Sequence, residues 1–211
     1  MAETLNLPER LIVPVFPLPN AILFPGARLP LYIFEPRYKR MIDDTLSQHR
    51  YLTVALMTEK DNEKTRAAIS GLGQITEIER LPKNEKNILV IGLRRVKVIR
   101  EVSSEPYISA EVMPLVETVP ESSTHERLFA SLREAVKAWL FRMRTGNVRY
   151  LKELGDVKTL GELCDFFGAY LLDDFATRQS LLEELDIARR AEFIIELVDT
   201  QLYYYSAPFE N

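Results

Sequence analysis

The pattern of apolar and polar positions changes character near residue 118. Before that point, short runs of β-branched and aromatic residues are separated by glycine, proline and asparagine, which is typical of β-strands joined by turns. We expect strands at residues 10–16, 28–33, 51–57, 67–78, 88–91, 95–102 and 107–115. About seven short strands in succession favour a closed or nearly closed antiparallel barrel.

One short helix interrupts the strand pattern. Proline is tolerated in the first turn of a helix, so Glu35-Pro36 is a suitable start. The apolar positions that follow have helical spacing, at Tyr38, Met41, Ile42 and Leu46. Residues 58–66 contain no apolar side chain, which indicates a solvated loop.

Glycines divide the later strands. Gly71 and Gly73 lie inside an expected strand and indicate a bulge or a sharp bend. Gly92 is expected to end the apolar run 88–91 before the next strand begins at residue 95. The run itself is continuous, which is typical of a strand buried on both faces.

Beyond a linker at residues 116–123, the pattern becomes helical. Leu128, Leu132 and Val136 begin one apolar stripe, and further helices are expected at 160–172 and 176–185. Asp186 is a suitable N-cap for a fourth helix. The sequence therefore predicts an α+β protein, with a β-barrel domain at residues 1–117 and a helical bundle domain at 118–211.

The stretch from Phe16 to Tyr38 is unusual because it carries five of the twelve prolines and is also rich in large apolar residues. Proline excludes a helix interior and a central strand, and the apolar content excludes a disordered linker. We expect an extended, rigid segment that places large side chains in a core. Its exposed edge is a candidate binding surface.

Composition limits the classes of partner. The chain has 211 residues, a net charge of −4 and a pI near 5.4, which argues against nucleic acid as the main partner. One cysteine, Cys164, cannot form an internal disulfide. No signal peptide and no apolar run long enough to span a bilayer is present in the sequence. We therefore expect a cytoplasmic protein without a membrane partner.

Motifs for enzyme chemistry are missing from the sequence. It has no phosphate-binding loop of the GxxxxGK type and no GxSxG nucleophile motif. The two histidines, His49 and His125, are far apart and lack other ligands at zinc spacing. We expect no catalytic residue, no cofactor and no metal.

Several segments together resemble the substrate-binding domain at the N-terminus of the ATP-dependent protease Lon. They are PVFPLPNAILFPGARLPLYIFEPRY, GLGQITEIERLP, ILVIGLRRVKVI, PYISAEV and RQSLLEELDIARRAEFIIELV, in that order, and the resemblance covers roughly residues 10–202. IFEPRYKRMI is most similar to stand-alone bacterial members of the family. The resemblance implies a PUA-like pseudobarrel followed by helices. It also implies a role in engaging polypeptides or partner proteins rather than in cleaving them, since the ATPase and protease domains of Lon are not in this sequence.

Our first hypothesis is a non-catalytic module that binds unfolded or extended polypeptides. Candidate contact residues are Phe24, Tyr32, Arg37 and Tyr38. For each of them, packing in the core is the competing and more common explanation, because large apolar side chains are usually buried. The sequence predicts no oligomeric state.

Two other hypotheses stay open at this point. PUA-like barrels elsewhere bind RNA, and a basic cluster of Arg94, Arg95, Lys97 and Arg100 is the candidate for that role. Alternation along a strand places Arg95 and Lys97 on one face, so the cluster is also explained as the solvated side of a half-buried strand. An uncharacterised hydrolase is the third hypothesis.

Overall fold

The computed structural model describes residues 7–60, 63–142 and 147–206. Contacts divide the chain into two compact units. The first comprises the chain up to Val116 together with Leu172–Glu183, and the second comprises Glu117–Leu171 and the chain from Glu184 onward. Residues 172–183 thus belong with the strands, although they lie beyond the predicted domain boundary. The division into independently folding domains at residue 117 stays a prediction.

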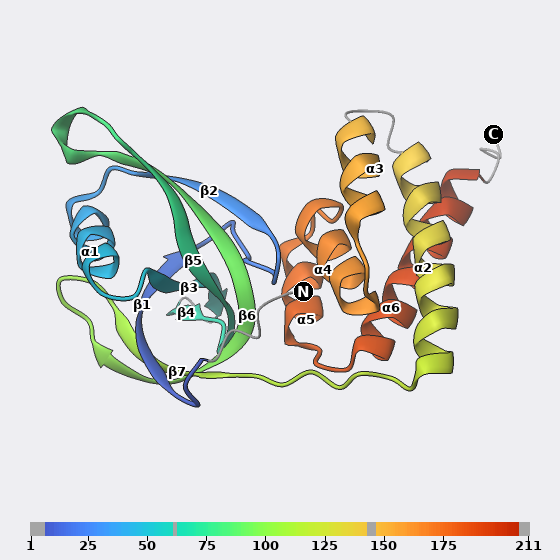
Figure 1. Cartoon of the computed structure of the whole chain (residues 1–211), viewed down its shortest axis with the longest axis horizontal. Helices are drawn as coiled ribbons and strands as arrows, with labels where there is room; N and C mark the ends of the chain where they lie inside the picture. Colours follow the sequence, from blue (N-terminus) through green and yellow to red (C-terminus); the bar gives the residue numbers. More distant parts are fainter. Residues whose placement is uncertain (1–6, 61–62, 143–146, 207–211) are drawn as a thin grey trace. The chain divides into compact units, whose positions relative to one another are not determined.

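Five strands of the first unit close into a ring (Figure 1). They are β1 (Leu11–Leu18), β3 (Tyr51–Lys60), β5 (Ile69–Arg80), β6 (Lys86–Ser103) and β7 (Ser109–Pro114). The order is β1-β7-β6-β5-β3, and β3 returns to β1. Every pair is antiparallel except β1 with β3, which closes the ring in parallel. The predicted barrel is confirmed.

Strand β1 closes the ring by changing partners along its length. Its first half, up to Pro14, pairs with β7, and Val15 to Leu18 pair with β3. Pro14 lies at the change of partner, where its missing N–H group costs the ladder little. Two further strands extend the sheet: β2 (Arg28–Ile33) pairs with β6, and β4 (Glu63–Arg66) pairs with β3.

Two local predictions for the strands were wrong. Residues 58–60 and 63–66 are not a loop, because β3 continues to Lys60 and pairs with β4, and residues 61–62 lie outside the described residues. Thr65 and Arg66 are exposed there, so the ladder needs no apolar side chain. Gly92 does not end a strand either, since β6 runs unbroken from Lys86 to Ser103. Gly92 instead allows two backbone segments to approach each other closely.

The close approach involves residues 22–24, which we call the plug segment because they are buried against the barrel strands. A Cβ on Gly92 would lie 1.9 Å from the carbonyl oxygen of Phe24, and one on Gly71 would lie 1.9 Å from that of Leu23. Only glycine allows the backbones to approach so closely. Part of the extended, rigid segment expected from the proline content is therefore packed against the barrel strands.

Two helices belong to the first unit. Helix α1 (Pro36–Ser47) begins at Pro36 and buries Tyr38, Met41, Ile42 and Thr45, in agreement with the predicted amphipathic helix. Helix α5 (Phe175–Glu183) packs against the strands, where Gln179 Nε2 donates to the carbonyl of Ile69 at 2.9 Å. A 3₁₀ turn, η1 (Pro82–Asn84), joins β5 to β6.

The second unit is a helical bundle, but the helix expected at 176–185 is α5 of the first unit. It contains α2 (Ser122–Arg142), α3 (Asn147–Asp156), α4 (Leu160–Tyr170) and α6 (Ile187–Ser206). Helix α3 was not predicted. Asp186 caps α6 as expected, because its Oδ1 accepts from the backbone N–H of Ala188 at 2.9 Å and of Arg189 at 3.2 Å.

The start of the second unit is fixed to its last helix. The backbone N–H of Thr118 donates to Leu185, and that of Ile187 donates to Thr118. The fully buried Arg190 then pairs with Glu117 at 2.5 Å and with Asp165 of α4 at 3.3 Å. Residues 117–118, expected as part of a linker, are thus anchored within the bundle.

Candidate functional site

A cavity of about 590 Å³ opens in the first unit beside the end of β1, the end of β2 and the start of α1. We call it the β1–β2 groove. Most of the residues that line it are apolar or aromatic: Phe16, Pro17, Leu18, Pro19, Leu31, Tyr32, Ile33, Phe34, Glu35, Arg37, Tyr38 and Met57. The two ends of the Phe16–Tyr38 stretch thus line one cavity.

Two aromatic side chains stand exposed on the wall of the groove. Tyr32 is 52% exposed and Phe34 is 56% exposed. They are two positions apart at the end of an extended segment, so they project to the same side. Their rings stack, with centroids 5.6 Å apart and planes 29° apart. Large exposed aromatics beside a cavity are typical of a binding surface.

Tyr38 forms a buried part of the groove, and Arg37 covers it. The Tyr38 ring lies 4.4 Å from the ring of Phe16, and the Arg37 guanidinium lies 4.5 Å from the centroid of the Tyr38 ring. Arg37 Nε also donates to Glu35 at 3.0 Å. Burial is the main cause that raises the pKa of Tyr38, against an opposing effect of Arg37. The hydroxyl therefore stays neutral.

The backbone of β2 supplies a second kind of contact. In the part of the chain that the structure describes, β2 pairs with β6 alone, so its other edge has unpaired backbone groups. Pro30 lacks a donor, which is tolerated on such an edge. An edge strand can accept an extended chain by main-chain hydrogen bonds.

The structure brings three of the four predicted contact residues to this groove: Tyr32, Arg37 and Tyr38. Phe24 is not among them. It is 0% exposed within the plug segment, so it is unavailable to a ligand on the surface. Phe34 lines the groove but was not predicted. Its spacing from Tyr32, directly before Glu35-Pro36, is the signal that could have identified it.

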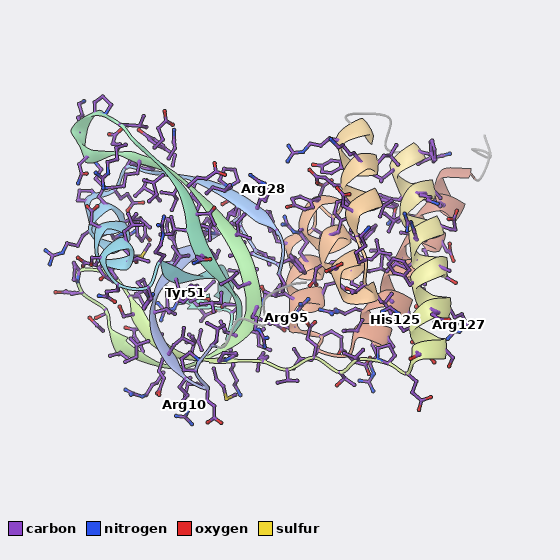
Figure 2. All side chains as sticks on the ribbon, viewed as in Figure 1. Arg10, Arg28, Tyr51, Arg95, His125 and Arg127 are labelled. Carbon is purple, nitrogen blue, oxygen red and sulfur yellow. The ribbon has the colours of Figure 1, made fainter. Side chains whose placement is uncertain are left out.

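The four predicted basic residues do not form a surface stripe. Arg95 of β6, labelled in Figure 2, is 1% exposed, and its Nε donates to the carbonyl of Leu182 in α5 at 2.9 Å. Lys97 and Arg100 are exposed, but Arg100 pairs with Glu111 at 2.8 Å, and Arg94 is half-buried. Alternation places Arg95 and Lys97 on one face as expected. Helix α5 covers only Arg95.

Other chemistry has little support in the described residues. Among them, no group of three or more histidine, cysteine, aspartate or glutamate side chains is arranged to hold a metal ion. No described helix combines the length and apolar character needed to cross a membrane. The β1–β2 groove is therefore the candidate site.

Comparison with known proteins connects this fold to one family. The model of the ATP-dependent protease La (LON) substrate-binding domain matches residues 12–200. Two proteins of Sorangium cellulosum are similar in sequence: Lon protease 2 at 27% identity over 204 residues and Lon protease 3 at 28% over 202 residues. These matches cover 92% and 93% of this chain but 25% and 24% of the relatives. The chain thus spans about a quarter of the length of these proteases.

Two solved structures share the fold. The N-terminal domain of Mycobacterium avium complex Lon protease matches with a TM-score of 0.72 at 20% identity, over 90% of this chain and 98% of that one. The Lon N-terminal domain protein from Xanthomonas campestris matches with a TM-score of 0.65 at 23% identity, over 88% and 98%. The architecture expected from the resemblance is confirmed. The chain belongs to the LON substrate-binding domain family.

Proposed function

We propose that this protein is a non-catalytic module that binds extended, apolar segments of polypeptides in the β1–β2 groove. One observation carries the proposal: an aromatic-walled cavity of about 590 Å³ lies beside a sheet edge that pairs on one side only, in the described chain. The cavity can take apolar side chains, and the edge can hydrogen-bond their backbone. Unfolded polypeptides expose both features together, whereas folded proteins bury most of them.

The family supports this function at a coarser level. Its description as a substrate-binding domain of an ATP-dependent protease fits a role in recognising polypeptides. A cytoplasmic location is part of this proposal. The RNA hypothesis gains no support, because Arg95 is buried and Arg100 is paired with Glu111. No arrangement in the described residues favours a hydrolase.

Binding can be tested with fluorescein-labelled α-lactalbumin that has been reduced and carboxymethylated, so that it stays unfolded. The double variant Tyr32→Ser/Phe34→Ser removes both exposed rings of the groove. Aromatic contacts contribute about 1 kcal/mol each beyond their buried area, so we expect affinity to fall roughly tenfold or more. Fluorescence anisotropy provides the dissociation constant.

Two controls define the result. Phe141→Ser removes a 75% exposed aromatic from α2 in the second unit and should leave binding unchanged. Native α-lactalbumin, whose apolar segments are buried, should not bind. Equal affinity of the double variant and the wild type would contradict the proposed groove.

A further inference from the structure

A polar network fixes the turn between β5 and β6 against helix α1. Lys83 and Asn84 in this turn have φ angles of 60° and 56°, in the left-handed region. That conformation is uncommon for a lysine and needs support from its surroundings. Lys39 of α1 supplies it, since its Nζ donates to the carbonyl of Lys83 at 2.7 Å.

A buried lysine supports the same turn from β6. Lys86 is buried, and its Nζ donates to Asn84 Oδ1 at 3.0 Å and to Asp43 Oδ2 of α1 at 3.2 Å. Removing the charge or its partners would leave a buried polar group unsatisfied, which is costly. The turn and α1 are therefore held together as one rigid edge.

Glu85, the last residue before β6, connects this edge to the groove. Its Oε2 accepts a hydrogen bond from the Tyr32 hydroxyl, and its Oε1 lies 4.0 Å from Lys39 Nζ. Glu85 is not among the residues that line the groove. Its hydrogen bond with Tyr32 is the contact that joins it to a residue of the groove wall.

We propose that Glu85 is a positioning residue of the β1–β2 groove: it holds Tyr32 by its hydroxyl, so that the ring stays stacked on Phe34 as a preformed wall. This inference rests on the proposed polypeptide-binding function. An exposed tyrosine without this bond samples several rotamers, and fixing one of them upon binding costs affinity. Lys39 Nζ lies 4.0 Å from the carboxylate, and the contacts of Lys86 with Asn84 and Asp43 hold the turn that precedes Glu85 against α1.

The test uses the unfolded, labelled α-lactalbumin described above with the full chain. Glu85→Ala and Tyr32→Phe should each weaken binding roughly three- to tenfold, because each removes the same hydrogen bond. The double variant Glu85→Ala/Tyr32→Phe should bind no more weakly than either of these single variants. Glu85→Gln retains an acceptor oxygen, so it should bind within about twofold of the wild type.

A matched control and a spectroscopic readout separate positioning from a loss of folding. Glu79→Ala removes another exposed acceptor on the same hairpin, one that bonds Asn87 at 2.8 Å, and should leave binding unchanged. The hydrogen bond to Glu85 is the main cause that raises the pKa of Tyr32 above 10.0. Glu85→Ala should therefore lower that pKa toward 10.0, as measured by phenolate absorbance against Tyr32→Phe.

The outcomes are distinct. Full affinity in Glu85→Ala with a lowered pKa of Tyr32 overturns the positioning role and leaves the groove as the binding site. Full affinity in Tyr32→Ser/Phe34→Ser overturns the proposed groove and the role of Glu85 with it. If Glu85→Ala does not fold, the affinities of Tyr32→Phe and Glu85→Gln are compared instead. The inference requires Tyr32→Phe to bind more weakly than Glu85→Gln, and equal weakening in both variants would overturn it.

Discussion

At the scale of single residues, the closest backbone contacts of the barrel depend on glycine. Gly71 and Gly92 lie against the backbone of the plug segment, and Gly73 lies where a Cβ would be 2.4 Å from Val90. These three residues come from two neighbouring strands and face one chain segment. They explain why the proline-rich stretch can enter the barrel at all.

Gly92→Ala should therefore destabilise the first unit. The added methyl group would meet the carbonyl oxygen of Phe24 at 1.9 Å, and backbone cannot give way as a flexible side chain can. Overpacking of this kind costs roughly 1 to 3 kcal/mol. Chemical denaturation followed by circular dichroism should show a lower midpoint.

The matched control is Gly155→Ala in α3. A Cβ at that position has nothing within 4 Å, and alanine favours a helix over glycine. Its stability should be unchanged or higher by roughly 0.5 to 1 kcal/mol. If both variants lose stability equally, the close approach at Gly92 does not limit the fold.

At the scale of elements, α5 depends on the strand it covers. Arg95 donates to Leu182 at 2.9 Å and to Leu181 at 3.4 Å, and these carbonyls belong to the last turn of α5. A cation at this end also interacts favourably with the helix dipole. The guanidinium lies 5.9 Å from the ring of Phe24, so the plug segment and α5 meet at one buried side chain.

Arg95→Met should loosen α5 while the barrel stays folded. The substitution removes charged hydrogen bonds worth about 1.5 to 3 kcal/mol and leaves the carbonyls of the helix without the guanidinium as a donor. We expect faster hydrogen exchange at the amides of Phe175–Glu183. Lys97→Met, on the same face of β6 but exposed, should not change that exchange. Slow exchange in Arg95→Met would show that apolar packing alone holds α5.

The position of α5 also shows why part of the candidate site and fold escaped prediction. Alternation along β6 correctly relates Arg95 to Lys97, but a pattern within a strand does not record what covers its face. Arg95 donates to the backbone carbonyls of Leu182 and Leu181, which any residue type would provide. Phe24 was named as a candidate contact beside the more common explanation of packing in the core, and its burial fits the latter. Its approach to Gly92, far along the chain, has no local signature.

At the scale of the whole molecule, periodic elements were predictable and their boundaries were less so. Six of the seven strands, α1 and the cap of α6 follow from apolar spacing, proline and Asp186, whereas β4 was expected as a loop and β6 as two strands. The groove was partly predictable, because Tyr32, Arg37 and Tyr38 lie in the stretch with unusual proline content. The supporting role of Glu85 depends on its contact with Tyr32, 53 residues away along the chain, which spacing does not contain.

Cutting the chain at the predicted boundary should separate the strands from part of their own unit. A fragment of residues 1–117 lacks α5 and so loses the contacts of Arg95 and Gln179. We expect it to unfold at lower denaturant concentration than the intact chain, by about 2 kcal/mol or more.

Adding a synthetic peptide of residues 172–183 should restore part of that stability. A peptide of the same composition in scrambled order serves as the control. Equal stability of the fragment with and without the peptide would show that residues 1–117 form a domain by themselves.

The distance along the chain between Arg95 and α5 has a consequence for synthesis. Leu182 follows Arg95 by 87 residues, so the strand leaves the ribosome well before the helix that covers it. At usual rates of translation, the delay is on the order of ten seconds. During that interval the arginine faces water, and the nascent barrel is missing one of its layers. The last steps of folding of the first unit must therefore wait for a helix that is encoded 87 residues after the strand it covers.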